Sequence, residues 1–266
     1  MSYGSNGQIS GAFGGKIILA NVSYFVRTDG SDQNDGLANN SGRAFLTIQH
    51  AIDIASAILN IYQYQITIYV ADGDYNGFEC KSSVSKTISI NSINEAGARI
   101  VSVFTYCIKA SDIVGTLYRI SGFYLSNNIG TTAYGLLITG SIIEVNHLRM
   151  EYFNYGIWTE KVAVLRLLGR IHFNTGSYVQ GIKNVDASII DARGSEFTFN
   201  GNPNWISTFI SMQNLSLFMK DGACIGAATG KRYTVSVNSV INVNGAGINY
   251  FPGTVAGTTA TGGEYV

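Results

Sequence analysis

Two carboxylates, Glu160 and Asp186, come nearest in this chain to the spacing of a catalytic pair. Each lies thirteen residues before a phenylalanine, Phe173 or Phe199, in segments that share an aromatic residue, an asparagine and a glycine. If these phenylalanines occupy equivalent places in neighbouring repeats, the carboxylates lie on adjacent repeats, close enough for glycoside hydrolysis. The alternative is that both are solvated surface residues, and we favour it because few other charged residues surround them.

Two tryptophans are candidates for contact with a sugar or with another subunit. Trp158 follows Gly156 and Ile157, and Trp205 follows the turn-forming stretch 201–204. The chain also has 16 tyrosines. Aromatic faces beside uncharged hydrogen-bonding groups suit sugars. The same side chains suit packing between subunits, and for any single tyrosine we weigh this alternative above sugar binding.

Acidic and metal-binding residue types occur without the spacing of a metal site. Asp29, Asp32 and Asp35 lie in a turn-rich stretch, but their spacing does not match an EF-hand loop, and turn formation explains them. The three histidines are scattered, and the three cysteines show no CxxC pattern. We therefore expect no metal ion, no cofactor and no disulfide framework.

The charge balance argues against several partners. Lys and Arg number 17, as do Asp and Glu, so the net charge is zero and no basic run is present to attract nucleic acid or anionic lipid. The apolar run 17–26 is interrupted by Asn21 and Ser23 and is too short to cross a bilayer. We expect neither nucleic-acid binding nor membrane insertion, and folding in a reducing cytoplasm.

Strand-forming residues interrupted by turn residues predict an all-β fold. The chain has 31 Gly but only 2 Pro, and after residue 65 short apolar segments alternate with Gly, Asn, Asp or Ser. Asparagines at 127, 154, 174 and 200 recur at intervals of about two dozen residues, which is typical of one coil of a parallel β-helix. Phe153, Phe173 and Phe199 are then expected to stack inside.

One helix is expected. Ile48, Ala51, Ile52 and Ala55 follow helical spacing behind Thr47, a good N-cap residue. Residues 44–58 are expected to cover the N-terminal end of the β-helix, because open strand edges invite association. We divide the chain into a glycine-rich arm and first strand (1–23), an entry strand, turn and capping helix (24–60), the parallel β-helix (61–250) and a C-terminal tail (251–266).

Three stretches, 24–36, 44–53 and 68–75, resemble the entry module of pectate-lyase-like right-handed parallel β-helix proteins of the bacteriophage and prophage tail spike or fibre type. The ending 252–266 resembles the tails of phage-borne proteins of this kind. The resemblance implies a right-handed, single-stranded β-helix, a homotrimer and a place in a virion. It supports the fold more than the function, since this scaffold serves lyases, hydrolases and inert fibres alike.

Three functions remain open. The first is a virion structural protein, a short tail spike or fibre that attaches to other virion proteins through its N-terminal arm and contacts a host surface polysaccharide. The second is a polysaccharide lyase or glycosidase that uses Glu160 and Asp186. The third is an architectural subunit without a ligand. The short chain and the scarcity of acidic residues favour the first and argue against an enzyme.

Overall fold

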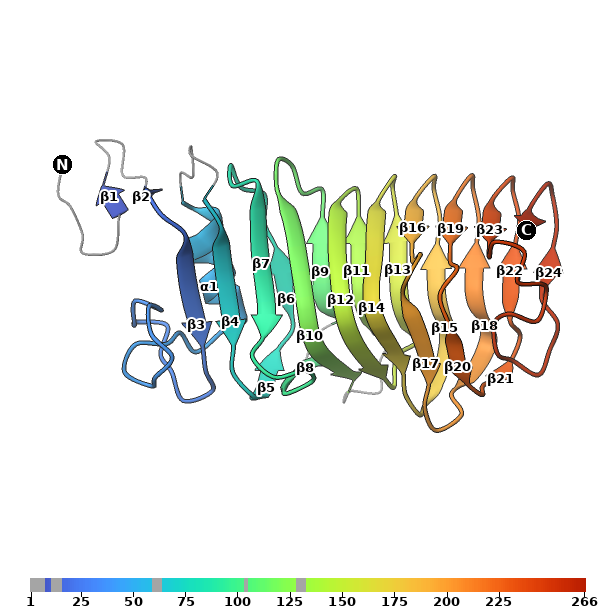
Figure 1. Ribbon diagram of the computed structural model, residues 1–266, viewed down its shortest axis with the longest axis horizontal. Helices are drawn as coiled ribbons and strands as arrows, with labels where there is room; N and C mark the ends of the chain where they lie inside the picture. Colours follow the sequence, from blue (N-terminus) through green and yellow to red (C-terminus); the bar gives the residue numbers. More distant parts are fainter. Residues whose placement is uncertain (1–7, 11–15, 59–63, 103–104, 128–132) are drawn as a thin grey trace.

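The residues that the structure describes form a parallel β-solenoid of about eight turns with a single helix. The structure is a computed structural model that describes residues 8–10, 16–58, 64–102, 105–127 and 133–266. Strands account for 52% of it. Figure 1 shows the coils stacked side by side from the N-terminal to the C-terminal end. The all-β, parallel β-helix expected from the repeats is confirmed.

Two walls of the solenoid belong to one 14-stranded sheet. Three long strands run through both walls and turn a corner at Gly122, His147 and Gly169, which have φ values of +82°, +49° and +61°. Left-handed backbone of this kind favours glycine and bends the strand sharply. The long strands are β10 (Leu117–Asn127), β12 (Ile142–Glu151) and β14 (Val164–Phe173).

The remaining strands of this sheet pair with one half of a long strand or continue beyond it. The first wall contains β3 (Val22–Val26), β4 (Ile66–Val70), β7 (Thr87–Ser92), β16 (Ile189–Asp191), β19 (Leu217–Met219), β23 (Val240–Asn242) and β25 (Glu264–Tyr265). The second contains β5 (Gly73–Asn76), β8 (Ala98–Ser102), β17 (Glu196–Phe199) and β20 (Cys224–Gly226).

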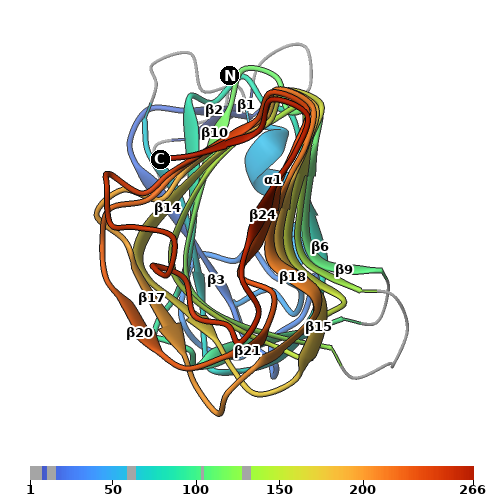
Figure 2. The ribbon, with the colours of Figure 1, turned by 90° about the vertical axis from the view of Figure 1, so that its right-hand side faces the viewer.

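The third wall is a separate nine-stranded parallel sheet. Figure 2 looks along the stack and shows this wall facing the other two across the interior. Its strands are β6 (Phe78–Cys80), β9 (Tyr106–Ser111), β11 (Tyr134–Thr139), β13 (Tyr155–Glu160), β15 (Ser177–Asn184), β18 (Asn204–Met212), β21 (Thr229–Gly230), β22 (Tyr233–Val235) and β24 (Thr258–Thr259).

The corner between the third and first walls repeats a two-residue left-handed turn. The paired residues with positive φ are 161–162, 186–187, 214–215 and 237–238. Each turn donates a backbone hydrogen bond to the next coil, as from Val162 to Asp186 and from Ala187 to Asn214. Buried Ser188 reinforces the corner, because its hydroxyl accepts a hydrogen bond from the Ala163 N–H at 3.0 Å. The turns therefore satisfy their polar backbone groups along the stack.

The interior is a column of apolar side chains in register from coil to coil. Phe173 and Phe199 stack with ring centroids 5.6 Å apart, as the repeats predict. Phe153 is buried but lies outside this column, because Met150 is the partner of Phe173 on the preceding coil. Likewise the amides of Asn174 and Asn200 bond each other at 3.1 Å, whereas Asn127 and Asn154 bond backbone groups instead. The predicted ladders thus extend over two coils, because the bends differ in length.

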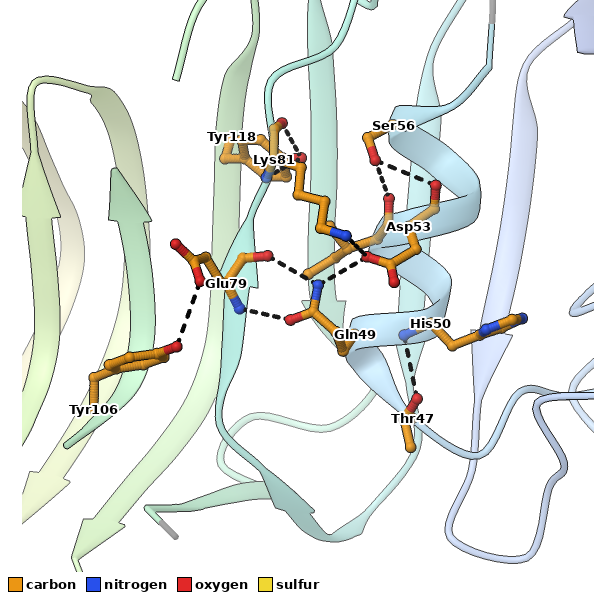
Figure 3. Close-up of polar contacts among 10 residues, drawn as sticks. Thr47, Gln49, His50, Asp53, Ser56, Glu79, Lys81, Tyr106 and Tyr118 are labelled. Carbon is orange, nitrogen blue, oxygen red and sulfur yellow. Dashed lines mark hydrogen bonds and ion pairs between the residues drawn. The ribbon is translucent and has the colours of Figure 1, made fainter. Parts of the chain in front are cut away.

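Helix α1 (Ile48–Ser56) closes the third wall at the N-terminal end, and Figure 3 shows the contacts. Thr47 is its N-cap, as predicted, and the helix packs against β3, β4 and β6 through Ile48, Ala51, Ile52 and Ala55. The Gln49 side chain accepts a hydrogen bond from the Glu79 N–H (2.8 Å) and donates one to the Glu79 carbonyl (3.2 Å). At the free edge of β6, the backbone N–H and carbonyl of Glu79 therefore bond a side chain in place of a neighbouring strand.

The tyrosine Tyr118 completes this closure from inside the solenoid. Its hydroxyl donates to the Lys81 carbonyl at 2.8 Å and accepts from the Lys81 N–H at 3.1 Å. Lys81 in turn forms an ion pair with Asp53 of α1 at 2.6 Å. The segment that follows β6 is therefore held from both sides.

The two ends of the chain differ from the expected division. Residues 251–266, expected as a tail, provide β24 and β25, which add to the third and first walls. Phe251 is fully buried and packs on Phe209 and Phe218, so a loop residue closes the core at this end. Parallel pairing begins at β3, within the expected arm and entry segment. In the arm, β1 (Gln8–Ser10) pairs antiparallel with β2 (Lys16–Ile18); residues 1–7 and 11–15 lie outside the described residues.

Candidate functional site

Aromatic side chains form a row on the outer face of the third wall. Tyr106, Tyr134 and Tyr155 are successive partners in the parallel strands β9, β11 and β13. Each tyrosine is partly exposed, whereas the residue that follows it, Cys107, Gly135 or Gly156, is buried, so strand alternation places the tyrosine rings on the outer face. The rings of Tyr134 and Tyr155 stack with centroids 5.2 Å apart and planes at 15°. We call these three tyrosines and Trp158 the aromatic row.

Trp158 meets both stacked tyrosines edge-on. Its ring centroid lies 5.2 Å from that of Tyr134 and 4.8 Å from that of Tyr155. The indole Nε1 donates a hydrogen bond to Glu160 Oε2 at 3.0 Å. Trp158 and Lys183 are partners on neighbouring strands, and Lys183 Nζ lies 3.7 Å from the ring centroid, a cation–π contact. The row therefore combines aromatic surface with a cation and a carboxylate.

The electrostatic state of Lys183 reflects its position against the row. Burial lowers its pKa from the ordinary value, while Glu160 and Asp186 act in the opposite direction. A lowered pKa makes an amine easier to deprotonate and is a feature of functional lysines, although packing against aromatic rings produces it too. Both carboxylates predicted from the sequence thus act on the same ammonium group.

Glu160 and Asp186 lie on adjacent coils, as expected, but each carboxylate already has a partner. Glu160 ends β13 and accepts hydrogen bonds from Trp158 and, at 3.4 Å, from the Thr139 hydroxyl. Asp186 is the first residue of a left-handed corner turn, with φ of +56°, and accepts a hydrogen bond from Asn214 Nδ2 at 2.8 Å. Aspartate tolerates this conformation well, so Asp186 has a structural role at the corner.

Trp205 does not belong to the surface site. It lies in β18, not in the preceding loop, and is 1% exposed. Its ring packs on Phe209 at 4.7 Å and on Phe173 at 5.9 Å. The expectation that Trp205 contacts a glycan or a subunit is wrong, because inward alternation in β18 places the indole in the core.

A pocket of about 480 Å³ opens beside Tyr106, where the third wall meets α1. Figure 3 shows Tyr106, Glu79, Gln49 and Thr47, four of the residues that line it. The others are Thr28, Leu46, Ile48, Asp74, Tyr75, Asn76, Gly77 and Phe78.

Both carboxylates of the pocket are paired with cations. Glu79 contacts Lys109 Nζ at 2.8 Å, and Asp74 contacts Arg99 at 2.5 Å. The hydrogen bond from Arg99 lowers the pKa of Asp74, so this side chain stays an acceptor over a wide pH range. The pocket is close to neutral and offers hydrogen-bond acceptors beside aromatic and aliphatic surface.

The acidic turn serves the fold. Asp32 accepts hydrogen bonds from the Leu46 and Thr47 N–H groups and from the Thr47 hydroxyl, and so anchors the start of α1. Asp35 accepts a hydrogen bond from the Leu37 N–H and so forms a turn of the kind that we expected. Asp29 forms an ion pair with Arg27. Within the described part of the chain, no three His, Cys, Asp or Glu residues are grouped to hold a metal ion. Nor do the described residues include a helix long and apolar enough to cross a membrane.

Sequence reasoning found Trp158 but missed the tyrosines and Lys183 beside it. A signal is present, because Tyr134–Gly135, Tyr155–Gly156 and Gln180–Gly181 occupy the same place on three successive coils. The glycines in this column leave no room for a Cβ: one added at Gly156 would lie 2.6 Å from the Gly181 carbonyl oxygen. The recurrence of a glycine after Tyr134, Tyr155 and Gln180 could therefore have revealed how β11, β13 and β15 are aligned.

No family model matches the chain, and neither a curated protein nor a solved structure matches it.

Proposed function

We propose that this chain is a structural, glycan-contacting subunit of a bacteriophage surface appendage, a short tail spike or fibre. The observation that carries the proposal is the aromatic row on the outside of the solenoid. Apolar ring surface beside hydrogen-bonding and charged groups suits the mixed apolar and hydroxyl faces of sugars. The sequence resemblance of residues 24–75 to phage-borne β-helix proteins supports the setting in a virion.

The geometry of the row favours a polymer over a single sugar. Parallel strands repeat at about 4.8 Å, so equivalent side chains recur along the stack and present a linear surface. Tyr106, Tyr134 and Tyr155 occupy three successive coils. A polysaccharide that lies along the stack would contact several of them at once, and weak single contacts would add up.

In this proposal the chain folds in the host cytoplasm, assembles as a homotrimer and joins other virion proteins through residues 1–23. A flat outer wall also suits subunit packing, so the aromatic row has two possible occupants. They differ in what they predict: loss of a sugar contact weakens adsorption, while loss of a subunit contact lowers the oligomer mass.

The test is retention on a panel of immobilised bacterial capsular, O-antigen and exopolysaccharides, with the mass measured by analytical ultracentrifugation. The Trp158→Ala and Tyr155→Ala variants should lose about tenfold or more in affinity for a retained polymer. Tyr152→Ala is the matched control, because Tyr152 is 52% exposed and lies outside the row. Lack of retention of the unmodified protein on every member of the panel would overturn the proposal. A lower oligomer mass for Trp158→Ala would assign the row to subunit packing.

A second candidate is a polysaccharide lyase or glycosidase on the same scaffold, and one observation favours it. Lys183 has a lowered pKa and interacts electrostatically with both Glu160 and Asp186. A lysine amine with a lowered pKa beside a carboxylate is a candidate acid–base pair. An enzyme should release reducing ends or unsaturated sugars from a retained polymer, and Glu160→Gln should abolish the release while the fold persists. Asp186→Asn tests the second carboxylate, and asparagine suits the left-handed turn equally well.

A further inference from the structure

The aromatic row ends at the pocket beside α1. Tyr106 belongs to both: it lines the pocket and is the strand partner of Tyr134. Glu79 lies on β6, the neighbour of β9 toward the N-terminal end, and also lines the pocket. Its carboxylate lies 3.5 Å from the Tyr106 hydroxyl. A chain that follows the row toward the N-terminal end therefore reaches this pocket.

The row cannot continue past the pocket. Among the described residues, β6 is the last strand of the third wall at this end, and the Gln49 side chain occupies its free edge. Ile48 and Gln49 of α1 form part of the pocket lining, so the helix stands across the path that a further coil would take. A polymer bound along the row must either end here or leave the surface.

The pocket has the chemistry to hold a sugar ring. Its apolar surface comes from Leu46, which is 41% exposed, and from Tyr106. Its acceptors are the Glu79 and Asp74 carboxylates, which are paired with Lys109 and Arg99. Sugar hydroxyls donate to carboxylates, while the CH face of the ring packs on apolar and aromatic surface. The pairing of both carboxylates with cations makes an uncharged sugar the best fit.

The volume agrees with such a ligand. Small-molecule sites have volumes of about 300 to 1,000 Å³, and this pocket has about 480 Å³. We propose that the pocket binds the terminal, uncharged sugar of a glycan chain whose following units lie along the aromatic row. The site is thus specific for a chain end. The inference rests on the proposed glycan contact, and its test separates the two.

The first measurement uses monosaccharides, which need no polymer. Glucose, galactose and N-acetylglucosamine are titrated into isotope-labelled protein while NMR follows the Leu46 and Ile48 methyl groups and the Thr28 amide. Saturable shifts confined to these residues are expected with at least one sugar. Asn76→Trp, which fills the pocket from an exposed position on β5, should abolish them, and Leu46→Ser should abolish the shifts of Ile48 and Thr28. Gln213→Trp, an exposed substitution on a distant coil, should leave them unchanged.

The second measurement counts chain ends. Partial hydrolysis of a retained polysaccharide multiplies its ends without changing its repeating unit. If the pocket recognises an end, the protein bound per gram of polymer rises with the number of ends, and Asn76→Trp removes this dependence.

The outcomes distinguish the inference from the function. Absence of shifts in the pocket with all three sugars overturns the inference, as does binding that is indifferent to the number of ends. If Trp158→Ala still weakens polymer binding by about tenfold or more in either case, the proposed glycan contact survives. If no polysaccharide is retained but a monosaccharide binds in the pocket, the proposed function fails and the pocket stands as a sugar site.

Discussion

The side-chain amide of Gln49 bonds both backbone groups of Glu79, and so replaces a neighbouring strand with a single residue. The two hydrogen bonds measure 2.8 and 3.2 Å, and the same amide donates to Asp53 at 2.9 Å. A strand edge left open would present unpaired donors and acceptors to other chains. Gln49 therefore supports both the stability of the first coils and the solubility of this end.

Gln49→Ala should lower the free energy of unfolding by about 1 to 3 kcal/mol, because it leaves two partly buried backbone groups of β6 without their side-chain partner. Urea denaturation measures the loss, and amide hydrogen exchange should accelerate in β6 and α1 before it does in later coils. Gln33→Ala, at an exposed glutamine, is the control and should change neither. Equal stability of the two variants would show that solvent replaces the Gln49 amide without cost.

Gly156→Ala should destabilise the protein by about 1 to 3 kcal/mol through crowding in the glycine column. The added Cβ would lie 2.6 Å from the Gly181 carbonyl oxygen, a backbone atom that cannot turn aside. Thermal unfolding monitored by circular dichroism measures the effect. Gly42→Ala is the control, because its Cβ would have only a 3.6 Å contact with the Asn40 side chain. Unchanged thermal unfolding of Gly156→Ala would contradict the close packing of β13 on β15.

Phe251→Ala should cost about 3 to 5 kcal/mol, the usual effect of removing a buried phenylalanine. The ring is fully buried against Phe209 and Phe218 and closes the core at the C-terminal end. Hydrogen exchange should rise first in β22 to β25. Ile248→Ala changes a residue of the same loop that is 66% exposed and should have little effect. If both variants unfold at the same urea concentration, Phe251 does not act as a plug.

Lys220→Met should change how stability depends on pH. Lys220 is 1% exposed, its Nζ donates to the Ser195 carbonyl at 2.5 Å, and burial lowers its pKa below the ordinary 10.5. Between that lowered pKa and 10.5 the unfolded chain binds more protons at this lysine, so this residue makes the native protein more stable as pH rises. Methionine cannot titrate, and it removes this contribution.

The measurement is the free energy of unfolding of both proteins at several pH values in that window. The stability of the unmodified protein relative to Lys220→Met should increase with pH. Other groups titrate equally in both proteins and cancel in the difference. A difference that stays constant, or that falls with pH, would contradict the lowered pKa.

Local patterns in the sequence were sufficient for the elements and for the fold class. Thr47 and the apolar spacing after it predicted α1, and the recurring Asn and aromatic residues predicted stacked coils. These signals are short-range: a cap, a helical stripe, a bend. The exact register was not accessible in this way, because the bends differ in length, and so Phe153 was placed in a column that Met150 occupies.

The candidate site depends even more on contacts between coils, which local sequence patterns do not reveal. Strand pairing brings Tyr134 to Tyr155 and Trp158 to Lys183 from different coils, and no local pattern shows which side chains meet. A shift of one residue in the register would have turned each of them to the other face. Trp205 illustrates the consequence, since its type suggested a surface contact and its alternation in β18 buries it.

The amino-acid sequence by itself determined that this chain is all-β, repetitive, uncharged overall and capped by one helix, because composition and short-range periodicity carry that information. Only the tertiary structure decided which residues form the aromatic row, that a pocket lies at its end, and that Gln49 closes the sheet. These features depend on contacts between coils, and such contacts are set by the lengths of all the bends that separate them.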